Sequence, residues 1–183
     1  SNSIVVQETG LGWEWVHVHG FVEDIDVMVD DVFVDSNGSI YAIGNSRGDS
    51  RFSTLTYGQC ILPESLVFFI LKLQSNGQCE WAVNVTVNGH INLGNKETWK
   101  MNSIVVDDLG NSYVSGFVRG HADEYNFNET ISYTNSGGFV GFLAKYNPLG
   151  KLQWVETFVD YEITSVDIIT NDQIIIAGYQ MNL

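Results

Sequence analysis

The chain is a series of short runs in which β-branched and aromatic residues are mixed with polar ones, and none of them has the spacing of an amphipathic helix. In the middle of the chain these runs cover about residues 101–107, 111–118, 139–146 and 151–158. Turn sequences such as Asp35-Ser-Asn-Gly38 and Asn147-Pro-Leu-Gly150 stand between runs of this kind, and their glycines supply a positive φ. The pattern predicts an all-β protein made of antiparallel strands.

The pattern repeats along the chain. Asp35–Gly48 and Asp107–Gly120, about 72 residues apart, both read D-x-x-G-x-x-Y-x-x-G-x-x-R-G. Val67–Trp81 matches Val140–Trp154 at an offset one residue longer, and a weaker third copy runs from Ser165 to Gly178. Four antiparallel strands per repeat predict β-propeller blades, each a four-stranded antiparallel meander.

The repeats define the expected domain organisation. Residues 1–183 are predicted to form a single propeller domain, with full blades at 27–86 and 99–158. Residues 163–180 supply only the first two strands of another blade, and 1–20 supply only the last two. The chain therefore holds about three blades' worth of strands.

Three blades are too few for a closed ring, because propellers close with about four to eight. One solution is a homodimer with six blades, in which the strand pair Ile4–Gln7 and Trp13–His19 of each copy completes the other copy. The alternative is a piece of a longer propeller, which the start at Ser1 and the stop at Leu183 favour.

The second unit resembles a known repeat family. Ile104–Gly116 reads I-V-V-D-D-L-G-N-S-Y-V-S-G, and Phe142–Trp154 reads F-L-A-K-Y-N-P-L-G-K-L-Q-W. Both stretches are similar to the SBBP-type β-propeller repeat. The third copy departs from the repeat, with Asp172 where the turn glycine should stand. The resemblance implies a propeller and no particular activity.

The two repeated tryptophans are the most specific structural prediction. Trp81 and Trp154 each follow a turn glycine by four residues, and Trp15 stands in the corresponding place near the N-terminus. We expect Trp81 and Trp154 to be buried between blades at equivalent positions, so that either change to alanine costs about 3–5 kcal/mol.

Composition narrows the range of partners. The 22 acidic and 8 basic side chains give a net charge of −14, which argues against nucleic acid and anionic membranes. The longest unbroken apolar run, Leu66–Leu71, is far shorter than the roughly 20 residues of a membrane span. The classes of partner that remain are a protein and a glycan.

Cysteines and glycosylation signals bear on the compartment. Cys60 and Cys79 either form one bridge or remain two small core residues. Sequons at Asn37, Asn84 and Asn128 fit a secreted or surface-exposed protein, although an Asn-rich chain also produces them by chance.

Signals for catalysis and metal binding are weak, and the sequence favours a protein that is not an enzyme. Gly44–Gly48 matches G-x-S-x-G but is expected to be a turn at the end of a strand, without the strand-to-helix setting of a hydrolase elbow. His17 and His19 share one strand face but have no third ligand, so no metal site is predicted. The acidic segment Glu23–Asp35 leaves calcium possible as the only cofactor, with a solvated acidic rim as the alternative.

Candidate binding residues lie at one end of the predicted blades. Arg47 and Arg119 occupy equivalent places after the strand glycine, where each makes either a ligand contact or a salt bridge to a neighbouring blade. The long connections at the same end, 45–66, 86–98 and 117–138, are expected to form a binding face. They carry His90, His121 and Tyr125, together with Tyr57, Phe127 and Tyr133, a mixture that suits contact with a partner and equally suits a loop that packs on its own blade.

Three functions are compatible with this face. The first is an interaction or scaffold module that binds a protein partner, and the second is a carbohydrate-binding propeller. The third is an enzyme whose site lies at the central channel, which requires a cluster of perturbed carboxylates or histidines there.

Overall fold

The computed structural model describes residues 25–48, 55–57, 60–62, 68–88, 99–119, 124–127, 132–133, 138–170 and 173–181. Every regular element in these ranges is a β-strand, and all paired strands are antiparallel, so the all-β prediction is confirmed. The strands are β1 (Ile25–Val34), β2 (Ile40–Gly48), β3 (Leu55–Tyr57), β4 (Cys60–Leu62), β5 (Phe68–Leu73), β6 (Cys79–Asn88), β7 (Trp99–Val106), β8 (Ser112–Arg119), β9 (Glu124–Asn126), β10 (Ser132–Tyr133), β11 (Phe139–Tyr146), β12 (Leu152–Val159), β13 (Tyr161–Thr170) and β14 (Gln173–Gln180).

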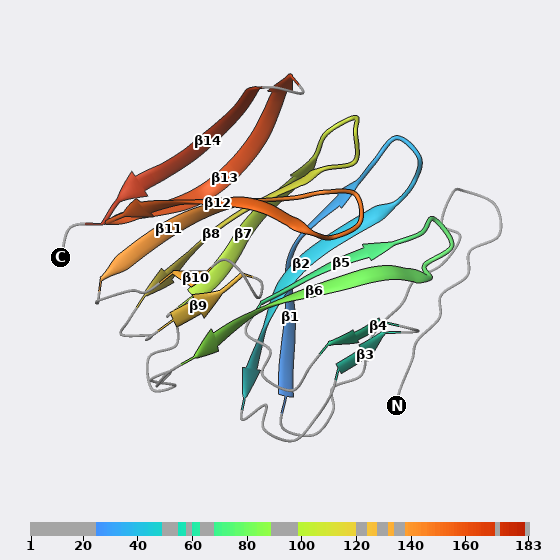
Figure 1. The fold of residues 1–183 in the computed structure, drawn as a ribbon, viewed down its shortest axis with the longest axis horizontal. Helices are drawn as coiled ribbons and strands as arrows, with labels where there is room; N and C mark the ends of the chain where they lie inside the picture. Colours follow the sequence, from blue (N-terminus) through green and yellow to red (C-terminus); the bar gives the residue numbers. More distant parts are fainter. Residues whose placement is uncertain are drawn as a thin grey trace.

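The long strands form three sheets, which lie one above another in Figure 1. In the first sheet, β1, β2, β5 and β6 pair in chain order, and β9 and β10 extend it beyond β6. In the second sheet, β7, β8, β11 and β12 pair in chain order, at the four runs that the sequence predicts. The third sheet contains only β13 and β14. The predicted strand pair within residues 1–20, with Trp15, lies outside the described residues.

A bulge at the same place in each sheet explains the repeated strand glycine. The pairing between the first and second strands skips one residue opposite this glycine in all three sheets. The skipped residues are Asp30, Asn102 and Thr164, and the glycines are Gly44, Gly116 and Gly178. A Cβ on Gly116 would lie 2.2 Å from the carbonyl oxygen of Lys100, so only glycine fits beside the bulge.

We expect Gly116→Ala to lower the free energy of unfolding by about 2–3 kcal/mol, because the backbone of β7 must move to admit the methyl group. Ser115→Ala is the matched control, since Ser115 is fully buried and its hydroxyl has no hydrogen-bond partner among the described residues. Its removal should cost less than about 0.5 kcal/mol. Urea denaturation of both variants measures the difference, and equal midpoints would contradict the role given to the glycine.

The tight turns at one end of the sheets share a hydrogen-bonding pattern. Asp35 Oδ1 accepts a hydrogen bond from the backbone N–H of Ser39 at 2.8 Å, and Gly38 has a φ of 79°. Asn147 Oδ1 accepts one from the N–H of Lys151 at 2.9 Å, and Gly150 has a φ of 73°. The predicted turns and the positive φ of their glycines are therefore confirmed.

Apolar side chains fill the spaces between the sheets. The front face of a sheet is the face toward the next sheet along the chain, and the rear face is the opposite one. The largest cluster joins the front face of the first sheet to the rear face of the second, where Phe68 lies 6.1 Å from Phe142 between ring centres. A second cluster around Tyr113 and Val166 joins the second sheet to the third. Each internal boundary is thus a hydrophobic sheet-on-sheet contact.

Candidate interaction surfaces

A ladder of three side chains crosses the front face of the first sheet. Lys72 pairs with Tyr41 on one side and with Trp81 on the other, and its Nζ lies 5.6 Å from the centre of the Tyr41 ring. The rings of Tyr41 and Trp81 meet edge to face at 6.1 Å. The second sheet repeats the ladder with Tyr113, Lys145 and Trp154. The predicted equivalence of the two tryptophans is therefore confirmed, but both are half-buried rather than fully buried.

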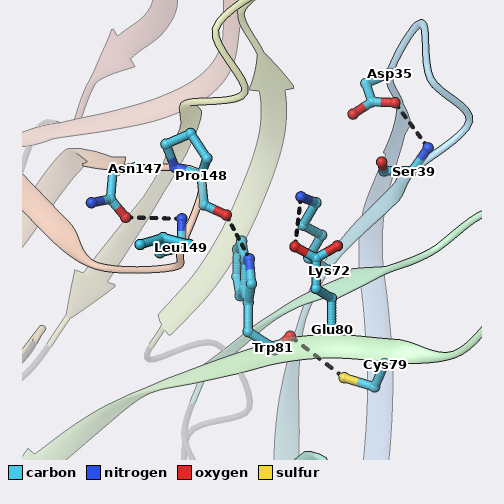
Figure 2. Close-up of polar contacts among 9 residues, drawn as sticks. All are labelled: Asp35, Ser39, Lys72, Cys79, Glu80, Trp81, Asn147, Pro148 and Leu149. Carbon is cyan, nitrogen blue, oxygen red and sulfur yellow. Dashed lines mark hydrogen bonds and ion pairs between the residues drawn. The ribbon is translucent and has the colours of Figure 1, made fainter.

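Trp81 also binds the neighbouring sheet (Figure 2). Its indole Nε1 donates a hydrogen bond to the carbonyl oxygen of Pro148 at 2.9 Å. Pro148 belongs to the turn between β11 and β12, and a Cβ on Gly150 in that turn would lie 2.8 Å from the indole. The tryptophan of one unit therefore docks on the last hairpin of the next unit.

Three buried or half-buried side chains in and near the ladder, Tyr41, Lys72 and Tyr146, have pKa values raised above the usual ones. Burial raises the pKa of Tyr41, and the nearby Lys72 offsets part of the increase. Burial would lower the pKa of Lys72, but its hydrogen bond to Glu80 at 3.0 Å and its contact with Tyr41 raise it above the usual value. Lys72 thus stays charged over the ring. Burial also raises the pKa of Tyr146, within the cluster between the first two sheets.

Two of the predicted long loops each contain a short hairpin. β3 and β4 form one hairpin, and a disulfide from Cys60 to Cys79 ties it to the first residue of β6, directly after the tight turn between β5 and β6. The structure thus decides in favour of the bridge, which the sequence left open. Cys60 covers a cluster on the rear face of the first sheet that includes Phe69 and Leu71. The other hairpin is β9–β10, and β9 pairs with the end of β6 through Val87 and Tyr125.

The structure places three of the five predicted binding residues, through their backbone alone. Arg47 pairs with Asp26 near the end of β2, and Arg119 pairs with Phe139 at the end of β8, so both lie at the long-loop end. Tyr125 lies in β9 between Val87 of β6 and Tyr133 of β10. Their side chains, and His90 and His121 as a whole, lie outside what the structure describes.

The structure decides two questions at this end. Phe127 is only 3% exposed and meets Phe142 of its own unit at 5.2 Å, so of the two alternatives for this loop residue the structure favours packing on its own unit. The G-x-S-x-G segment is not a turn, because β2 continues through Gly48 and Ser46 pairs with Val27. Strand pairing persists here because the partner strand β1 extends to Ile25, which pairs with Gly48.

A hollow that sequence reasoning missed lies at the tight-turn end. It has a volume of about 520 Å³ and lies where the ends of β1, β7 and β13 converge, lined by Phe33, Val105, Val106, Asp107, Asp108, Asp167, Ile168, Ile169 and Thr170. Asp107 is committed to structure, since its carboxylate accepts hydrogen bonds from the N–H of Asn111 and from the hydroxyl of Tyr113. Asp108 and Asp167 are exposed and make the hollow acidic. No single run of sequence contains these residues, so only the repeat register could have indicated it.

The acidic segment before the first turn has structural contacts. Asp30 Oδ2 accepts a hydrogen bond from Asn45 Nδ2 at 2.6 Å, and Asp31 Oδ2 accepts one from the backbone N–H of Ile104 in the second sheet at 3.0 Å. Within the described ranges no three His, Cys, Asp or Glu residues gather as metal ligands would. His17 and His19 lie outside these ranges.

The sequence was compared with protein families and with curated proteins. No known family matches this chain. The chain fits no protein-family model, and a search of curated proteins finds no similar sequence. In the part of the chain that the structure describes, no helix has the length and hydrophobicity to cross a bilayer.

Proposed function

We propose that the chain is a non-enzymatic β-propeller interaction module that binds a protein partner through its long-loop end. The stacking supports the propeller, because the first strands β1, β7 and β13 neighbour one another in order, as the inner strands of consecutive blades do. Hydrogen bonds join these strands, from Ile104 N–H to Asp31 and from Asn102 Nδ2 to the carbonyl oxygen of Ile163 at 2.8 Å. The resemblance to the SBBP-type repeat is the second support.

One observation carries the choice of surface. The hairpin β9–β10 comes from the second unit but pairs with β6 of the first, so loops of two units merge into one antiparallel surface at the long-loop end. Paired strands hold a loop in one conformation, which lowers the entropy lost on binding a partner. Tyr125 lies in the middle of this surface, with β6 on one side and β10 on the other. Tyrosine is one of the residue types that most often carry binding energy at protein interfaces.

The compartment is part of the proposal. The Cys60–Cys79 bridge requires an oxidising environment, which fits a secreted or surface-exposed protein. The net charge of −14 favours a partner with a basic surface, because opposite charges raise the rate of encounter.

A photo-crosslinking amino acid placed at position 125 tests the surface. We expect it to capture one protein reproducibly, and the purified partner to bind the wild type at least about tenfold more tightly than Tyr125→Ser. The matched control carries the same probe at Leu109, which is 68% exposed on a tight turn at the opposite end, and should capture nothing.

Capture from position 109 alone would overturn the assignment of the surface. A glycan array probed with the same wild-type protein tests the alternative that the chain binds a carbohydrate. One reproducible sugar ligand that Tyr125→Ser loses would replace the protein partner with a carbohydrate.

A further inference from the structure

The rear face of the first sheet is exposed at positions that are covered in the other two sheets. Relative to the strand glycine and its bulge, Val29, Val32 and Val34 of β1 occupy the same register as Met101, Ile104 and Val106 of β7. The residues of β7 are 0%, 2% and 8% exposed because the first sheet covers them, whereas those of β1 are 60%, 58% and 59% exposed. The third sheet resembles the second in this respect. At the equivalent positions of β13, Ile163 and Val166 are buried and Ile168 packs against the second sheet. Among the described residues the rear face of β1 therefore has no cover, whereas the rear face of β2, β5 and β6 is covered in part by the β3–β4 hairpin.

The front face of the third sheet shows the opposite half of the same pattern. Tyr41, Tyr113 and Ile175 occupy one register position, and their exposed fractions are 0%, 2% and 52%. At another register position Phe117 is 6% exposed, whereas Tyr179 is 51% exposed. The front faces of the first two sheets are covered by the sheet that follows, and the front face of β13–β14 has no following sheet among the described residues.

We propose that the front face of β13–β14 binds the rear face of β1 in a second copy of the chain, head to tail. The chain contains this contact twice already, between the first and second sheets and between the second and third. The proposed interface places the same register positions against one another for a third time. A second copy is therefore the one partner whose complementary surface is present in the structure.

Two such contacts close a ring of two chains. Each copy offers one front face and one rear face, so two copies use both and leave neither exposed, whereas a contact that did not close would continue into a filament. The contact between copies does not depend on what the long-loop end binds.

Sedimentation or light scattering on the full chain tests the proposal. The measurement is made at about 0.5 M salt, where repulsion between two chains of charge −14 is screened beyond a few ångström. We expect a particle of twice the chain mass of 20.4 kDa for the wild type. Val32→Glu, on the rear face, and Ile175→Glu, on the front face, should each give a monomer, because a charge then enters an apolar interface.

Mixing the two variants identifies the geometry. Val32→Glu retains an intact front face and Ile175→Glu retains an intact rear face, so an equimolar mixture should recover a dimer that neither variant forms alone. Leu109→Glu and Leu149→Glu are matched controls, since both leucines are exposed on tight turns and both variants should remain dimeric. An unchanged far-ultraviolet circular dichroism spectrum of each monomeric variant excludes misfolding as the cause, and it is expected because Val32 and Ile175 are exposed within one chain.

Three results would overturn the proposal. A monomeric wild type at about 100 µM is the first. A dimer that Ile175→Glu abolishes and Val32→Glu leaves intact is the second, because it would mean that two front faces meet. The third is a mixture of the two variants that stays monomeric.

Discussion

Replacing Trp81 with alanine should lower the free energy of unfolding by about 3–5 kcal/mol. The change removes the indole from between Tyr41 and the turn of the next sheet, and it removes the hydrogen bond to the carbonyl oxygen of Pro148. The lost stability has two sources. Apolar surface is no longer buried, and the carbonyl oxygen of Pro148 loses its hydrogen-bond donor. Urea denaturation followed by far-ultraviolet circular dichroism measures the effect.

Two variants separate the contributions at this contact. Trp81→Phe keeps an aromatic ring but has no N–H donor, so it should cost about 1–2 kcal/mol. Trp154→Ala removes the equivalent side chain of the second sheet, where no hairpin of a third unit packs on the indole among the described residues. It should therefore cost about 1–2 kcal/mol less than Trp81→Ala in the isolated chain. Equal losses for the two alanine variants would contradict the docking of Trp81 on the turn.

Removing the disulfide should cost about 3 kcal/mol. Cys60 and Cys79 are 19 residues apart, and a closed loop of this length restricts the unfolded chain by about that amount. The bridge also holds the β3–β4 hairpin over the rear-face cluster that contains Phe69 and Leu71. The double variant Cys60→Ala, Cys79→Ala avoids a free thiol, and its free energy of unfolding is compared with that of the oxidised wild type.

Reduction of the wild type provides the control for the disulfide. Dithiothreitol should lower the stability by the same amount as the double variant and should leave that variant unaffected. Amide exchange in β3 and β4 should accelerate in both cases, whereas β11 should be unaffected at first, because local opening precedes global unfolding. A double variant within about 0.5 kcal/mol of the wild type would show that the hairpin is held by its other contacts.

Most of the strand arrangement followed from local rules. The second unit shows why: each of its strands is bounded by a turn whose first residue is Asp or Asn and whose last residue is Gly, and those turns impose antiparallel pairing. The same rules failed at Gly44–Gly48, where two glycines and three polar residues suggested a turn. Pairing with β1 satisfies their backbone groups, and this outweighs the low strand propensity of the residues.

The candidate site was predicted less well than the fold. Arg47, Arg119 and Tyr125 were chosen by repeat position and by their place in long loops, and the structure does put their backbones at the long-loop end. Phe127 was chosen by the same reasoning and is buried against Phe142. Burial of a loop aromatic depends on which sheet lies beneath it, and loop sequence contains no periodic signal for that. The acidic hollow at the tight-turn end was missed for the same reason, because its lining residues come from three different sheets.

The sequence by itself determined the strands, the turns and the repeat. Each of these depends on interactions between residues a few positions apart, such as the hydrogen bonds of Asp35 within its own turn. Only the tertiary structure decided the rest. It closed the bridge between Cys60 and Cys79, docked Trp81 on Pro148, and left Val32 and Ile175 exposed where their counterparts are buried. These outcomes depend on which surfaces face each other across 19 to more than 60 residues of chain, and the free energy of burying those surfaces is a property of the assembled sheets.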